Sequence, residues 1–370
     1  MSQYTPYYVL DLDKAAEAYT TMCRVFAPAS VYYCVKACGE PGLLQHLGDA
    51  GALFEISSSG ELDRVIASRV PCDRIICGLP VKSDDEVNLL SRGGVGQFVF
   101  DHPDELQRLD RLAPTTKKIL RLRTGDSYAE EPFGVSLDEL AAWDRLGGVP
   151  AGAIDGVTFD IRGNREIERV LVALKLCAKV LDRFGTHESD RTTILNIGGN
   201  YRLPTEVRAD FYDRLLTELA YLREAYQTVV QVEIGRSVVK FAGRLVTTVI
   251  LVRQRAERLD VYLDAGEPSG ISHGPVSISR EADAGRLKNR TPARFFGMTC
   301  GRRPLFDFDL SFLPAVGDLL VLDGMGAYTI AKQSDFHAWS RTPVYCVTTD
   351  QVKQPILPTD QVSSWNNPDN

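Results

Sequence analysis

Short apolar runs alternate with longer amphipathic segments from about residue 25 to residue 240. The apolar runs are rich in β-branched and aromatic side chains, which is typical of buried strands. The predicted strands are 31–37, 53–57, 74–79, 97–100, 119–123, 156–161, 193–198 and 229–235. Helical patterns separate several of them, at 41–51, 59–69, 84–94, 102–112 and 166–185. Strands that alternate with helices predict parallel β/α units, and eight such strands favour a closed (β/α)8 barrel of the TIM type.

The pattern changes after about residue 240. The segments 244–254, 258–266, 318–324 and 342–350 are predicted to be strands, with little helix between them. The opening segment 4–13 is also strand-like, and we expect it to pair with this carboxy-terminal β region. The sequence therefore predicts an α/β protein of two domains. A barrel would cover residues 25–240, and residues 1–24 and 241–370 would form a mostly β domain, sandwich- or barrel-like.

Composition narrows the range of partners and compartments. The 370 residues carry a formal net charge of −7, which argues against nucleic acid or anionic lipid as the main partner. The eight cysteines are scattered and form no CxxC pair, so neither a zinc site nor a disulfide framework has its usual spacing. No apolar run has the length of a membrane span, and the first residues lack the pattern of a secretory signal. We expect a cytoplasmic protein with a small-molecule substrate and no metal site.

Lys36 is the first residue that suggests chemistry, because it ends the first predicted barrel strand. Side chains at the carboxyl ends of barrel strands face the catalytic side of the fold. A lysine there can be desolvated, which lowers its pKa and frees its amine to form a Schiff base. Taken alone, Lys36 fits a surface lysine just past a strand better than a catalytic residue.

Three later segments carry groups that suit a phosphorylated cofactor. Gly198 and Gly199 follow a strand directly, and the amides of such a turn can bind a phosphate. At the end of the next strand, Glu233 could hold a pyridine nitrogen protonated and Arg236 suits a phosphate. Tyr328 follows a glycine turn in the β region and could reach a phosphate oxygen. The alternatives are an ordinary turn, a surface ion pair and a packed aromatic ring.

Taken together and in this order, these segments resemble the fold-type-III pyridoxal-phosphate decarboxylases, a family that includes ornithine, diaminopimelate and arginine decarboxylases. The resemblance extends from TPYYVLDLD at residue 5 to SDFHAW near residue 340. The motifs that carry it are YYCVKA, FEISSSGEL, RIICGLPVKSDDEV, LRLRTGDS, FGVS, LNIGGN, EIGRS and GDLLVLDGMGAYT.

The resemblance implies pyridoxal 5'-phosphate as cofactor, held by Lys36 as an internal aldimine. Glu233 would bind the pyridine nitrogen and so favour a quinonoid carbanion after decarboxylation. The remaining cofactor-binding residues that the resemblance implies are Arg121, Asp160, Gly198, Gly199, Gly235, Arg236 and Tyr328. Cys300 matches a cysteine that protonates the substrate carbon across a dimer interface, so we expect a homodimer with shared active sites. An ordinary buried cysteine is the alternative for Cys300.

The sequence departs from the family pattern mainly where substrate would bind. Asp160 replaces a histidine that stacks on the cofactor ring, and Gly163 replaces a phosphate-binding serine. The family cysteine is normally followed by an aspartate that contacts the substrate's distal amine. Here Gly301 follows Cys300, and then come two arginines.

Arg302 and Arg303 suggest a substrate with a distal carboxylate, because a guanidinium pairs well with that group. Asp307 and Asp309 could instead restore a contact to an amine, and both arginines could be exposed loop residues. We therefore predict a carboxy-lyase that acts on an amino acid or an amino-acid-containing biosynthetic intermediate. An amino-acid racemase and a catalytically inactive regulatory relative are the alternatives.

Overall fold

The computed structural model describes residues 5–124, 132–145, 153–161, 166–184, 193–280 and 290–348. The chain divides into two compact units, and each is described by itself. One unit comprises residues 16–238, and the other combines residues 1–15 with 239–370. The division falls inside helix α1 (Leu12–Phe26), a helix that was not predicted although its buried positions Ala15, Tyr19, Met22 and Phe26 follow helical spacing.

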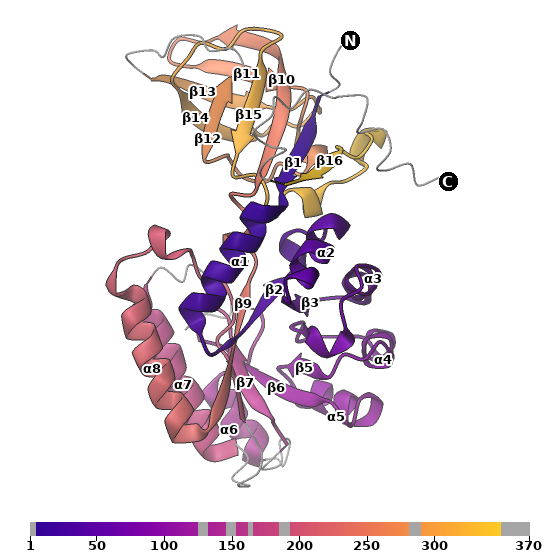
Figure 1. The fold of residues 1–370 in the computed structure, drawn as a ribbon, viewed down its shortest axis with the longest axis vertical. Helices are drawn as coiled ribbons and strands as arrows, with labels where there is room; N and C mark the ends of the chain where they lie inside the picture. Colours follow the sequence, from indigo (N-terminus) through magenta and orange to yellow (C-terminus); the bar gives the residue numbers. More distant parts are fainter. Residues whose placement is uncertain are drawn as a thin grey trace. The chain divides into compact units, whose positions relative to one another are not determined.

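The first unit is built on a closed barrel of parallel strands (Figure 1). In barrel order the strands are β2 (Ser30–Cys34), β3 (Leu53–Ile56), β4 (Ile75–Cys77), β5 (Gln97–Phe100), β6 (Lys117–Leu122), β7 (Gly156–Phe159), β8 (Thr193–Asn196) and β9 (Thr228–Ile234). Strand β9 pairs with β2 and closes the barrel. All eight strands coincide with predicted segments, so the predicted barrel is confirmed.

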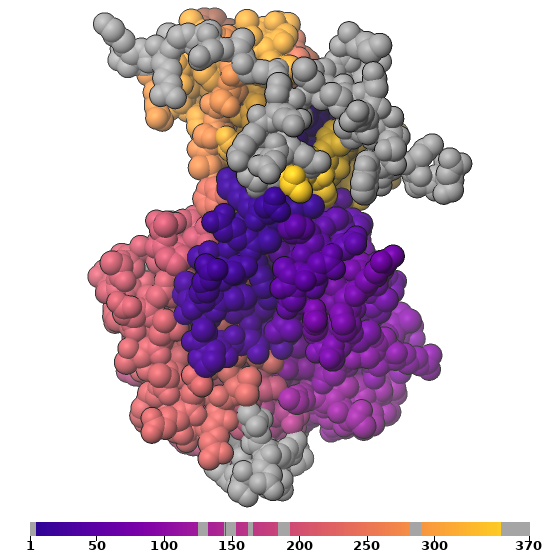
Figure 2. All heavy atoms as spheres, in the orientation of Figure 1, coloured from indigo at the N-terminus to yellow at the C-terminus, as the bar shows by residue number. Residues whose placement is uncertain are grey.

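The other helices of this unit are α2 (Pro41–Asp49), α3 (Ser59–Ala67), α4 (Asp84–Arg92), α5 (Pro103–Leu112), α6 (Leu137–Arg145), α7 (Ile167–Phe184) and α8 (Asp210–Tyr226). Local sequence fixes where several begin. The hydroxyl of Ser58 accepts a hydrogen bond from the Glu61 amide, and Ser83 accepts one from the Glu86 amide. On the face seen in Figure 2, the violet atoms of the segment from α2 to α5 form a continuous surface.

Side chains that point into the barrel fill its interior, and some of them are polar. The buried amides of Gln97 and Gln231 bond to each other in both directions, at 2.8 and 3.0 Å. Gln231 also lies within 3.4 Å of the Tyr32 hydroxyl. This network satisfies the buried polar atoms that it contains. Because side chains two apart on a strand face the same side, Gln231 on β9 places Glu233 on the same inner face, nearer the carboxyl end.

The second unit is mostly β. It contains an eight-stranded sheet with the path β12 (Ser277–Arg280), β15 (Leu319–Asp323), β10 (Gly243–Gln254), β11 (Leu259–Leu263), β13 (Thr291–Phe296) and β14 (Phe306–Leu310). Strand β1 (Tyr7–Asp11) pairs with β10 and with β16 (Val344–Val347). The predicted pairing of the opening segment with the carboxy-terminal β region is therefore confirmed.

Three strands of this unit were not predicted, namely β12, β13 and β14. Strand β14 does carry a strand signal in the alternation of its sequence FDFDL. The four-residue helix α9 (Arg236–Val239) follows β9. In the described part of the chain, every helix is too short or too polar to cross a membrane.

Gly156 on β7 offers a test of the barrel's packing. A Cβ atom there would overlap the main-chain oxygen of Ile194 and lie 2.7 Å from its Cβ. We expect Gly156→Ala to lower the free energy of unfolding by about 1–3 kcal/mol, measured by urea denaturation, because β7 and β8 would be forced apart. Gly96→Ala is the control, since a Cβ at that exposed position meets open space. Equal stability of the two variants would contradict this packing.

Candidate active site

Lys36 lies immediately beyond the carboxyl end of β2, in a short 3-10 turn. Its Nζ atom is 2.9 Å from the Oε2 atom of Glu55, which comes from the neighbouring strand β3. The Lys36 side chain keeps 42% of its surface exposed, whereas that of Glu55 is fully buried. The Lys36 amine is therefore held by the buried Glu55 carboxylate, while its side chain remains accessible to solvent.

The room for Glu55 is provided by the next strand. A Cβ atom at Gly78, just after β4, would overlap the carboxylate of Glu55. The Ser57 hydroxyl donates a second hydrogen bond to this carboxylate, at 3.2 Å from Oε1. Two donors and a bare glycine thus fix the position of a buried charge.

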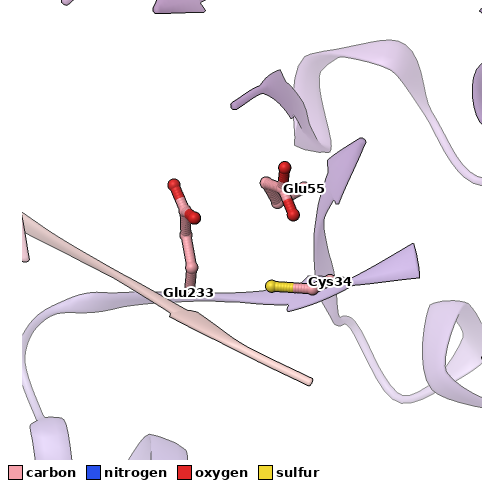
Figure 3. Close-up of side chains that lie close together, drawn as sticks. All are labelled: Cys34, Glu55 and Glu233. Atoms are coloured by element: carbon pink, nitrogen blue, oxygen red, sulfur yellow. The ribbon is translucent and has the colours of Figure 1, made fainter. Parts of the chain in front are cut away.

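Glu233 completes the cluster from the opposite side of β2. The side-chain amide of Asn196 donates to Glu233 Oε1 at 2.8 Å, and the Asn196 oxygen accepts from the Gly198 amide at 2.8 Å. Figure 3 shows the side chains of Glu233, Glu55 and Cys34 converging on one space, with ligand atoms within 4.8 Å of one another. One strand end each from β9, β3 and β2 supplies these groups.

The three groups also satisfy the spacing of a possible metal site within the described residues. A thiolate and two carboxylates can bind a divalent ion such as zinc. The ammonium group of Lys36 already neutralises Glu55 at 2.9 Å, and burial together with Glu55 raises the pKa of the Cys34 thiol well above its usual range. The arrangement therefore favours a lysine-centred site.

The electrostatics of the cluster differ from the sequence-based expectation for Lys36. Burial alone lowers the pKa of its amine, but the charge of Glu55, with smaller contributions from Cys34 and Glu233, outweighs burial and raises the pKa well above the ordinary lysine value. The expected lowering is therefore wrong, because the buried partner Glu55 was not foreseen. Burial and the nearby Glu55 charge raise the pKa of Glu233 to about 7.

The glycine turn after β8 packs directly on the neighbouring strand ends. Gly198 has a φ of +65°, and a Cβ atom there would overlap the main-chain oxygen of Phe159. A Cβ atom at Gly199 would lie 2.8 Å from the main-chain oxygen of Glu233. Both positions therefore require glycine, and the turn brings its main chain beside Glu233.

The segment after β9 contains Gly235, Arg236 and Ser237. Among the described residues, the buried hydroxyl of Ser237 has no hydrogen-bond partner. A buried hydroxyl without a partner has lost its hydration, so a ligand oxygen would stabilise it. Sequence reasoning assigned Arg236 to this segment and overlooked Ser237.

Asp160 follows β7, and its carboxylate lies 3.6 Å from the guanidinium of Arg121 on β6. The same guanidinium lies over the ring of Phe133, 5.7 Å from its centroid. The structure thus brings Arg121 and Asp160 together at neighbouring strand ends. Gly163, where the family serine was expected, lies outside the described residues.

The remaining predicted site residues belong to the β unit. Tyr328 lies in a turn after β15 and is half-buried, and Cys300, Arg302 and Arg303 are exposed in the segment between β13 and β14. Asp307 is engaged on the sheet, where Arg294 donates two hydrogen bonds to it at 2.7 and 2.9 Å.

The chain matches the model of the pyridoxal-dependent decarboxylase, pyridoxal binding domain, over residues 12–240. The chain belongs to this family. It is 25% identical to the chloroplastic ornithine decarboxylase of Nicotiana glauca over 363 residues, which cover 92% of this chain and 83% of that protein. It is 26% identical to the diaminopimelate decarboxylase of Neisseria meningitidis over 377 residues, covering 94% and 91%.

The decarboxylase also resembles solved structures. The arginine decarboxylase of Paramecium bursaria Chlorella virus superposes with a TM-score of 0.82 at 22% identity, covering 93% of this chain and 96% of that one. At that identity the likeness shows the fold, a closed parallel barrel with a mostly β second part. The family makes the protein an amino-acid carboxy-lyase with pyridoxal 5'-phosphate as cofactor.

The described residues fit this cofactor. Lys36 offers an accessible amine, Glu233 offers a carboxylate beside it, and the Gly198–Gly199 turn and Ser237 offer polar main-chain and side-chain groups. The sequence alone did not identify Glu55 or Asn196 as parts of the site. Glu55 lies inside the predicted strand 53–57 and Asn196 inside the predicted strand 193–198. Parallel strands of a barrel bring their carboxyl ends together at one rim, and polar residues near those ends are the signal that could have found them.

Glu55→Gln tests the electrostatic account of Lys36. Removing the buried charge leaves burial as the dominant influence, so the pKa of Lys36 should fall and the neutral amine should be present at lower pH. We expect the pH midpoint for the combination of apoenzyme with pyridoxal phosphate, followed by absorbance, to move down. Ser57→Ala is the control, because it removes a hydrogen bond to Glu55 and keeps the charge. An unchanged or higher midpoint in Glu55→Gln would contradict the account.

The Lys36–Glu55 ion pair also predicts how the stability of the fold depends on pH. Because the folded-state pKa of Lys36 is raised, the stabilisation from its ion pair is complete below the ordinary lysine pKa. It is lost as pH rises through the folded-state pKa.

Proposed function

We propose that this decarboxylase removes the α-carboxylate of its substrate at the cluster formed by Lys36, Glu55 and Glu233. The observation that supports the proposal most strongly is the accessible Lys36 amine, held 2.9 Å from a buried carboxylate at the mouth of the barrel. When bound there, pyridoxal phosphate accepts the electron pair left on the α-carbon as carbon dioxide departs.

Each residue of the cluster has a role that follows from its surroundings. Lys36 would hold the cofactor through its aldehyde, and its amine must lose a proton before it can do so. Glu55 is the nearest group to receive that proton, because its Oε2 atom already accepts a hydrogen bond from Nζ. Asn196 orients Glu233, whose carboxylate holds a proton on the pyridine nitrogen.

We assign phosphate binding to the Gly198–Gly199 turn, to Gly235 and Arg236, and to the Tyr328 hydroxyl. Main-chain amides at a glycine turn bind phosphate oxygens without a side chain in the way. Asp160, which lies 3.6 Å from the guanidinium of Arg121, would stand beside the cofactor ring in place of the family's ring-stacking histidine.

The proton that replaces carbon dioxide at the α-carbon comes, in this proposal, from the thiol of Cys300. This cysteine is exposed in its own chain, as a residue that serves a neighbouring subunit would be. We propose a homodimer in which each subunit lends Cys300 to the site built on the other subunit's Lys36.

The substrate, we propose, carries a second carboxylate at its distal end. Arg302 and Arg303 are exposed beside Cys300, and among the described residues neither has a carboxylate within ion-pair distance. Of the two aspartates that could contact a distal amine, Asp307 and Asp309, the first is already paired with Arg294. The loop therefore presents positive charge, which suits an acidic group.

A screen for carbon dioxide release tests both the reaction and the substrate class. It should compare basic, acidic and diamino dicarboxylic amino acids, and amino acids joined to a larger carrier. We expect the highest kcat/KM for a substrate with a distal carboxylate, and no release with Lys36→Ala. Recovery of the opposite enantiomer without carbon dioxide would identify a racemase, and the absence of any cofactor-dependent reaction would favour an inactive regulatory relative.

Substitution of the two arginines tests their role separately. Arg302→Gln or Arg303→Gln should raise KM for the acidic substrate about tenfold, because a hydrogen bond to a charged group is lost. Arg255→Gln is a matched control, since it removes a surface arginine that is paired with Asp260. Fastest release from ornithine or lysine, with no effect of the arginine substitutions, would overturn the proposed substrate class.

The shared site is tested by mixing two inactive proteins. Lys36→Ala and Cys300→Ala should each be inactive alone, and subunit exchange should restore activity, because half of the sites in each mixed dimer are intact. At equal concentrations we expect recovery to about a quarter of the wild-type activity. A mixture that exchanges subunits, as judged by differently tagged chains, and yet stays inactive would refute the sharing of Cys300.

A further inference from the structure

The turn that carries Tyr328 has an unusual backbone conformation. Tyr328 has a φ of +57°, in the left-handed region that residues with a side chain rarely adopt. Such a conformation persists only where neighbouring groups enforce it. The turn, defined here as residues 324–329, is buried except around Tyr328 itself.

One side of the turn is fixed by close main-chain packing. The amide of Met325 donates to the oxygen of Gly243 at 2.9 Å. A Cβ atom at Gly326 would overlap the main-chain oxygen of Val239, so the two backbones touch. Within the turn, the buried hydroxyl of Thr329 donates to the oxygen of Met325. These contacts hold the base of the turn.

The other side is held by the segment that follows the 3-10 turn Glu267–Ser269. The Ser272 hydroxyl donates to the main-chain oxygen of Tyr328 at 3.1 Å. The Nε2 atom of His273 lies 3.0 Å from the oxygen of Ala327 and donates to it in the tautomer that carries a proton there. Gly270 lies against the oxygen of Thr329 so closely that any side chain would overlap it.

These two side-chain contacts act on the two peptide groups that flank Tyr328. The oxygen of Ala327 belongs to the peptide plane before its Cα atom, and the oxygen of Tyr328 belongs to the plane after it. Fixing both planes fixes φ and ψ of Tyr328, and with them the direction in which its side chain leaves the backbone.

We propose that His273 and Ser272 are positioning residues that hold the Tyr328 hydroxyl ready for the cofactor phosphate. This inference rests on the proposed role of Tyr328 in phosphate binding. His273 and Ser272 touch neither cofactor nor substrate in this proposal. They act by enforcing a backbone conformation that Tyr328 would otherwise leave.

The test measures binding of two ligands to the full-length apoenzyme by absorbance titration. The affinity for pyridoxal phosphate depends on contacts to the phosphate, whereas pyridoxal has no phosphate group and cannot make them. His273→Ala and Ser272→Ala should each weaken binding of pyridoxal phosphate about threefold to tenfold, and leave binding of pyridoxal within about twofold. His273→Gln should restore most of the affinity, because its amide can donate from nearly the same place as Nε2.

Ser277→Ala is the matched control. Its exposed hydroxyl donates to Asp323 at 2.9 Å, just before the same turn, without touching the peptide groups around Tyr328. Binding of both ligands should be unchanged in this variant. Equal weakening of pyridoxal and pyridoxal phosphate in His273→Ala would indicate general damage and overturn the proposal.

Combination with Tyr328→Phe separates this inference from the function on which it rests. If His273 acts through the tyrosine hydroxyl, His273→Ala should cost less than twofold further in the Tyr328→Phe background. A full and additive loss in that background would overturn the positioning role. If Tyr328→Phe itself leaves pyridoxal phosphate affinity unchanged, the assignment of Tyr328 to the phosphate fails first. If only the His273 and Ser272 variants are silent, the positioning role alone fails.

Discussion

The ion pair between Lys36 and Glu55 is the interaction on which the rest of the site depends. A fully buried carboxylate is costly unless it is paired and hydrogen-bonded, and a lysine at the mouth of a barrel is useful only if its amine remains accessible. The geometry meets both requirements, because Glu55 is buried below and the Lys36 side chain is partly exposed above. The pair also places a carboxylate in hydrogen-bond contact with the amine that is proposed to bind the cofactor.

Holding charges at this position constrains the neighbouring strand ends. Gly78 must lack a side chain to leave room for Glu55, and Gly199 must lack one to approach the main chain of Glu233. Asn196 links Glu233 to the glycine turn by accepting from one neighbour and donating to the other. Glu233, proposed to act on the cofactor ring, and the Gly198–Gly199 turn, proposed to bind its phosphate, are therefore linked by hydrogen bonds through Asn196.

The periodicity of the sequence was sufficient to predict the barrel, because each strand there is a compact apolar run with a helix or a turn on either side. It was insufficient for β12 and β13, which are partly exposed and do not form apolar runs, and helix α1 was overlooked beside the strand-like start of the chain. Glu55 and Asn196 show the limit most clearly. Their positions in the chain are ordinary, and their importance arises only when strands β3 and β8 bring them to the rim that holds Lys36 and Glu233.

The two departures from the family pattern differ in how they are compensated. Asp160 introduces a negative charge where the family has a histidine, and the guanidinium of Arg121 in the same barrel pairs with it at 3.6 Å. Arg302 and Arg303 introduce positive charge beside Cys300, and no described carboxylate of the chain lies within ion-pair distance of either. The first charge is paired within the barrel, whereas the two arginines are exposed to solvent. The proposed selection of the substrate by the loop after Cys300 rests on this difference.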